Sequence, residues 1–170
     1  ADAVNVELWE HNAMIENYRV ATGFTDRNGR FTLDENIYGE PISNVDRGFG
    51  ESGGRDLYFK VQAENSAVRL SQTWRQDRLG LTYTYESDVV HDVQGDVEQD
   101  FRFVGTSETP DHAEVFGILG YAKDLREWVQ TRTGWERPQV SVLYPNANWP
   151  QYRGFDPYYD NIFLPENWRD

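Results

Sequence analysis

The chain has 170 residues, of which 38% are hydrophobic and 15% aromatic, so it is long enough for one domain with a substantial core and too short for two full-sized domains. Lys and Arg number 16 against 29 Asp and Glu, and the net charge of −13 repels phosphate backbones and anionic lipid surfaces, which disfavours nucleic acid and membrane surfaces as partners. No run approaches 18 apolar residues, so no membrane insertion is expected. The chain has no cysteine, which excludes disulfide frameworks, thiolate metal sites and cysteine nucleophiles.

The first elements that the sequence predicts are strands with period-two alternation. Residues 4–9 alternate between aliphatic and polar or aromatic side chains, and residues 18–25 continue in the same style. The Asn28-Gly29 pair then precedes a short β-prone run at 30–33. Because Asn-Gly supplies the positive backbone φ angles of a tight connection, we predict a hairpin between 18–25 and 30–33.

A long loop follows at 34–55, with one irregular edge strand around 36–38. The run 56–63 places Leu, Phe, Val and Ala on one face and is the clearest central strand. About seven strands are expected in all, and the later ones are predicted at 68–74, 81–85, 89–93 and 101–104.

The pattern changes after residue 105. Apolar residues recur at three- and four-residue spacing over about 110–133, after Thr109 as the N-cap, which predicts an amphipathic helix. A strand at 140–144, an aromatic and proline-rich stretch and an apolar run at 161–164 follow. We therefore predict a mainly β fold in which a sandwich at 1–105 carries a helix-containing extension at 106–170. The expected core includes Leu8, Phe31, Phe59, Val61, Phe116 and Leu119.

The segments VELWEHN, GFTDRNGRFTL and RDLYFKVQAEN resemble the transthyretin-like, or carboxypeptidase-regulatory-like, β-sandwich over roughly residues 4–104. This resemblance implies an Ig/transthyretin-like sandwich of about seven strands, in a protein that is secreted or lies at the cell surface.

The segment YYDNIFLP at 158–165 is similar to the lead-in of zincin metalloprotease domains in bacterial secreted proteins. Such an enzyme needs two histidines four residues apart on a helix, with a glutamate between them, to hold zinc and activate water. His11, His91 and His112 do not have this spacing, so no protease activity is carried over to this chain.

An acidic run at 86–100 is a candidate calcium site, because clustered carboxylate oxygens are the ligands that calcium prefers. Its spacing does not match an EF-hand loop. A solvated edge whose charges discourage strand addition explains the same residues. The candidate ligands are Asp88, Asp92, Asp96 and Glu98.

The stretch 149–159 is denser in aromatic residues than solubility requires, so it is a candidate binding surface for protein or carbohydrate. The alternative is that large rings fix an irregular segment against the rest of the fold. The candidate contact residues are Trp149, Tyr152, Phe155, Tyr158 and Tyr159.

We find no catalytic constellation, since the His112-x-Glu114 pair lies in the first turn of a predicted helix, where capping explains it. The favoured function is a non-catalytic extracellular module that contacts protein or carbohydrate, with calcium as the one candidate cofactor. One alternative is a filament subunit joined by strand addition through 1–9 or 162–164, with calcium assisting. Another is the non-catalytic part of a secreted metallopeptidase.

Overall fold

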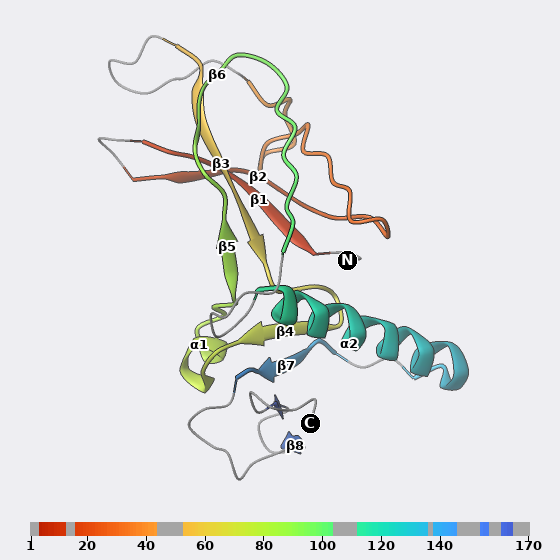
Figure 1. The fold of residues 1–170 in the computed structure, drawn as a ribbon. Helices are drawn as coiled ribbons and strands as arrows, with labels where there is room; N and C mark the ends of the chain where they lie inside the picture. Colours follow the sequence, from red (N-terminus) through yellow and green to blue (C-terminus); the bar gives the residue numbers. More distant parts are fainter. Residues whose placement is uncertain are drawn as a thin grey trace.

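The structure is a computed structural model, and it describes residues 4–12, 16–43, 53–103, 112–135, 138–145, 154–156 and 161–164. The fold is mainly β with a helix in the C-terminal part, as the sequence predicts, and its two sheets are consistent with the predicted sandwich (Figure 1). The elements in these ranges are β1 (Asn5–Glu10), β2 (Tyr18–Phe24), β3 (Arg55–Gln62), β4 (Val68–Ser71), α1 (Trp74–Arg78), β5 (Thr84–Glu86), β6 (Val90–Val93), α2 (His112–Thr133), β7 (Val140–Leu143), β8 (Gly154–Asp156) and β9 (Asn161–Phe163).

The N-terminal sheet has five antiparallel strands in the order β2-β1-β3-β5, with β6 also paired to β3. Leu8 of β1 lies opposite Phe59 of β3 on one side and Ala21 of β2 on the other. The predicted central position of the strand at 56–63 is therefore confirmed, because β3 pairs with three other strands.

One face of this sheet is buried under irregular chain. The segments 26–43 and 94–103 lie on the same side of the sheet and contribute Phe31, Leu33, Val97 and Phe101 as its cover (Figure 1). The buried residues beneath them are Val6, Leu8, Val20, Ala21, Leu57, Phe59 and Val93.

The strands predicted at 30–33 and 101–104 are wrong, since residues 30–33 and 101–103 form no strand. The turn before the first of them does form, with Gly29 at φ 77° and the Asp26 N–H donating to the Arg30 carbonyl at 2.7 Å. Beyond the turn, Phe31 and Phe101 stack on each other, and each packs edge-to-face against Phe59. Their β-prone composition therefore serves side-chain burial rather than strand pairing.

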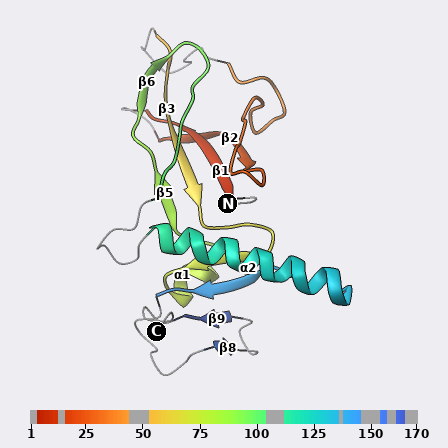
Figure 2. The ribbon, with the colours of Figure 1, turned by 45° about the vertical axis from the view of Figure 1, so that its right-hand side comes forward.

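The second sheet has the order β4-β7-β9-β8 and joins distant parts of the chain. β4 pairs in parallel with β7, and β7 pairs in parallel with β9. α2 lies between the two sheets in both views (Figures 1 and 2). The core between α2 and the strands includes Val61, Leu70, Val115, Phe116, Leu119, Val142 and Tyr144.

The predicted strand at 68–74 is too long, because β4 ends at Ser71 and the short helix α1 begins at Trp74. Thr73 is the N-cap of α1. Its hydroxyl accepts the Gln76 N–H at 3.2 Å, and the Gln76 side chain accepts the Thr73 N–H at 3.1 Å. This capping box satisfies two N–H groups that a helix start leaves without partners, so it favours the helix over continued strand.

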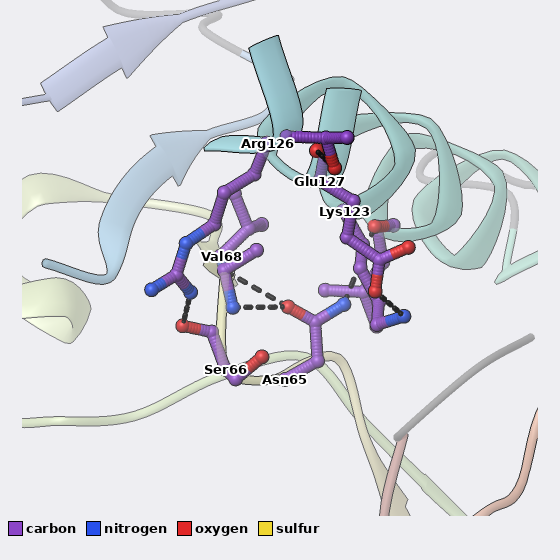
Figure 3. A network of polar contacts seen from close by, with 9 residues as sticks. Asn65, Ser66, Val68, Lys123, Arg126 and Glu127 are labelled. Carbon is purple, nitrogen blue, oxygen red and sulfur yellow. Dashed lines mark hydrogen bonds and ion pairs between the residues drawn. The ribbon is translucent and has the colours of Figure 1, made fainter. Parts of the chain in front are cut away.

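The turn between β3 and β4 is hydrogen-bonded to the middle of α2 (Figure 3). The Asn65 side chain accepts the Ala67 and Val68 N–H groups at 2.8 and 2.9 Å and donates to the Leu119 carbonyl at 3.4 Å. The Arg126 guanidinium donates to the Ser66 carbonyl. Helix and turn are therefore fixed to each other by polar contacts beside the apolar core.

No helix in the described ranges has the length and apolar character needed to cross a membrane.

Candidate functional site

The second face of the N-terminal sheet carries polar and aromatic side chains. Since side chains alternate between the faces of a strand, residues between the core positions point away from the covered side. We call this surface the open face. It comprises Asn5, Glu7 and Trp9 of β1, Arg19, Thr22 and Phe24 of β2, Asp56, Tyr58, Lys60 and Gln62 of β3, Thr84 and Glu86 of β5 and His91 of β6. Glu7 and Tyr58 are buried among the other side chains.

Glu7 is the centre of a hydrogen-bond network on the open face and is only 4% exposed. Its carboxylate accepts from the Trp9 indole N–H at 2.9 Å, from Gln62 Nε2 at 3.2 Å and from the Arg19 guanidinium at 2.6 Å. Asn5 Nδ2 donates to Gln62 Oε1 at 2.7 Å, which fixes the orientation of that amide. Three strands thus hold these side chains in one arrangement before any ligand arrives.

Lys60 lies beside the two aromatic rings of the open face. Its Nζ is 4.4 Å from the centre of the Trp9 ring, 5.5 Å from that of Tyr58 and 2.8 Å from the Glu86 carboxylate. Partial burial acts to lower the pKa of Lys60, but the hydrogen bond to Glu86 and the neighbouring Tyr58 and Glu86 charges raise it above its ordinary value. Lys60 therefore stays cationic and covers one side of the Trp9 ring.

At one end of the open face, Asp56 connects β3 to β6. Its carboxylate contacts His91 Nδ1 at 2.7 Å and accepts the Asp92 N–H at 2.8 Å. Partial burial acts to raise the pKa of Asp56, but these two hydrogen bonds, with the charges of His91 and His11, lower it below its ordinary value. The ionised carboxylate is thus the form that the fold favours.

Stability is therefore expected to depend on the ionisation of Asp56. The pKa of Asp56 is lower in the folded state than in the unfolded state. Ionised Asp56 therefore adds to the free energy of unfolding at pH values above the unfolded pKa of about 3.9, and this addition is lost as the pH falls through the folded pKa. We expect Asp56→Asn to destabilise the protein near pH 6 and to cost much less near pH 3. Urea unfolding of both proteins at each pH measures this. An equal loss at both pH values contradicts the assignment.

Asp92, a predicted calcium ligand, lies in β6 and forms hydrogen bonds to residues at the start of β3. Asp92 has φ 54°, and its carboxylate accepts the Gly54 N–H at 2.5 Å while its own N–H donates to Asp56. The other predicted ligands, Asp88, Asp96 and Glu98, have exposed side chains. In the described ranges, no three His, Asp or Glu residues are grouped so that they could hold a metal ion. Calcium binding stays a prediction without geometric support in those ranges.

The predicted aromatic surface falls mostly outside the described residues. Trp149, Tyr152, Tyr158 and Tyr159 all lie outside them, and for Phe155 only the backbone is described, in β8 opposite Ile162 of β9. That surface therefore stays a prediction.

The two segments predicted as donors for strand addition are engaged within their own sheets. β1 lies between β2 and β3, and β9 lies between β7 and β8. Each has a neighbour on both sides, so in this arrangement neither offers an unpaired edge to another copy.

The sequence matches no protein-family model and no curated protein sequence. Among solved structures, a 9R-lipoxygenase from Cyanothece PCC8801 is matched at 17% sequence identity with a TM-score of 0.33, over 80% of this chain and 23% of that enzyme. The chain thus spans less than a quarter of that protein. A TM-score this low does not establish a common fold, so neither fold nor activity is transferred from it.

Proposed function

We propose that this chain is a non-catalytic binding module, secreted or displayed at a cell surface, and that its open face binds a neutral carbohydrate. The observation that carries the proposal is the preorganised network around Glu7 and Trp9. Sugars offer hydroxyl groups that both donate and accept, together with an apolar C–H face. The partly exposed Trp9 ring, with the amides of Asn5 and Gln62 fixed beside it, matches both properties.

The charges of the open face support a neutral ligand. Glu7 pairs with Arg19 at 2.6 Å, and Lys60 pairs with Glu86 at 2.8 Å. Opposite charges that already neutralise each other give little attraction to an anion or a cation. Selectivity then comes from hydrogen-bond geometry and ring contact.

The same pairing supports binding without catalysis. Glycoside hydrolysis needs two carboxylates on either side of the scissile bond, one of them able to donate a proton. Glu7 is instead held by three donors, and Glu86 is held by Lys60. The resemblance to transthyretin-like modules supports the extracellular setting.

The proposal is tested with the purified chain on an array of neutral glycans, followed by calorimetry with the best ligand. We expect Trp9→Ala to weaken binding about fivefold or more, because ring contact contributes about 1 kcal/mol or more to such a site. Tyr38→Ala is the matched control, since Tyr38 is a highly exposed ring in the segment that covers the opposite face. The proposal is wrong if no neutral glycan binds, or if Tyr38→Ala weakens binding as much as Trp9→Ala.

A further inference from the structure

Helix α2 has an apolar stripe on the side opposite its buried face. Tyr121, Leu125 and Trp128 are 69%, 62% and 56% exposed. They are spaced by four and three residues, so they lie on one side of the helix. The buried residues of α2 lie on the other side and are Val115, Phe116, Ile118, Leu119 and Lys123. Both sides of the helix are therefore suited to packing, and the described part of the chain buries only one of them.

The C-terminal half of α2 extends beyond the strands of the second sheet (Figures 1 and 2). No residue from 124 to 133 is buried, although the helix continues without a break to Thr133. A short helical segment has little stability in water unless one of its faces is packed. An exposed apolar stripe on such a segment is typical of an interaction site.

A shallow, open hollow lies on the surface of α2 next to this stripe. It is lined by Asp124, Glu127, Trp128 and Thr131, with Arg132 at its edge. The first four have the spacing i, i+3, i+4 and i+7, which is the set of residues that receives one side chain from a facing helix in knobs-into-holes packing. Such a set leaves room for one side chain of a second helix.

We propose that the facing helix is α2 of a second copy of this chain, packed antiparallel, with Leu125 of each copy in the hollow of the other. A two-fold axis relates the copies, so one contact is formed twice. In this register Tyr121 of one helix approaches Arg132 of the other. Leu125 packs beside Trp128 of the other copy.

The charges on α2 suit this antiparallel arrangement. Asp124 lies next to Leu125 and Arg132 lies one turn beyond Trp128, so antiparallel pairing brings Asp124 of each copy within one helical turn of Arg132 of the other. In the part of the chain that the structure describes, Asp124 forms no ion pair. Glu127 is already balanced by Lys123, whose Nζ is 2.7 Å away. Parallel pairing would instead place like charges together.

The net charge of −13 on each copy opposes association at low ionic strength. At about 0.15 M salt the Debye length is about 8 Å, so the distant charges of two copies are screened while contacts at the helix remain. The dimer is therefore expected at physiological salt and at high protein concentration.

The first test is sedimentation velocity of the full chain over a wide range of concentrations in that salt. We expect a monomer–dimer equilibrium, and we expect Leu125→Asp to raise the dissociation constant at least tenfold. Leu79→Asp is the matched control, because Leu79 is a leucine of similar exposure outside α2. A wild-type chain that stays monomeric at every concentration overturns the proposal, as does equal weakening by both variants.

The second test uses charge reversal and does not depend on losing an apolar contact. Asp124→Arg and Arg132→Asp each place like charges across the antiparallel pair, so each variant alone is expected to dimerise at least tenfold more weakly than wild type. Mixing the two variants restores opposite charges at both contacts and is expected to give a heterodimer. Circular dichroism confirms that each variant is folded. Failure of the mixture to associate more strongly than either variant alone contradicts the antiparallel register.

Discussion

Replacing Leu119 with alanine is expected to lower the free energy of unfolding by about 3 kcal/mol. Leu119 is fully buried where α2 packs against the second sheet, in the same cluster as Leu70 and Val142. Truncation removes apolar contacts and leaves a cavity that neighbours on two rigid elements cannot fill by moving. Urea unfolding followed by tryptophan fluorescence measures the loss, with the midpoint shifting at unchanged slope.

The matched control for this prediction is Leu81→Ala. Leu81 is 53% exposed, so the same truncation there is expected to change the free energy of unfolding by no more than about 0.5 kcal/mol. Equal effects at the two positions would show that α2 does not pack on the second sheet as described.

Replacing Gly54 with alanine is expected to destabilise the protein by about 3 kcal/mol, because the new methyl group collides with backbone. A Cβ at this position would lie 2.3 Å from the carbonyl oxygen of Val93 and 2.6 Å from the carbonyl carbon of Asp92. Backbone atoms cannot rotate aside as a flexible side chain can. The start of β3 and the end of β6 would have to separate, and the Gly54–Asp92 hydrogen bond would be lost with them.

Gly95→Ala is the control for this collision. A Cβ at Gly95 would meet no atom within 4 Å, and Gly95 does not have a positive φ. We expect a change of no more than about 0.5 kcal/mol in either direction. Thermal unfolding of the two variants measures the difference. Similar melting temperatures for both would show that β3 and β6 do not approach as closely as described.

The strands that bury one face and expose the other could be predicted from the sequence, because burial of one face requires apolar residues at every second position. β2, β6 and β7 lie within predicted runs, and β1 and β3 are each offset from a predicted run by one residue. The failures at 30–33 and 101–104 arise because aromatic residues favour burial in irregular chain as much as in strands. Helix α1 was missed although Thr73 and Gln76 carry a capping-box signal, since the preceding β4 pattern was extended across it.

The candidate site was harder to predict than the fold. Its residues are the polar half of the alternating runs at 4–9 and 56–63, and such residues are usually read as a solvated face. The presence of Trp9 and Tyr58 among them was the signal that could have marked the open face. The two runs lie side by side because β1 pairs with β3. Such pairing between distant segments cannot be read from local sequence patterns. The acidic run at 86–100 is conspicuous in the sequence, because a high density of charge is evident even where the contacts of the side chains are unknown.

The parallel pairing of β4 with β7, and of β7 with β9, makes folding of the second sheet depend on the order of synthesis. The N-terminal sheet can assemble once the ribosome has released residues up to 93, but β4 has no strand neighbour until residues 140–143 are made, and β7 lacks its second neighbour until 161–163 are made. During that interval an apolar edge is open to wrong partners. Protein shortened within this late region should therefore aggregate rather than persist as a smaller folded unit.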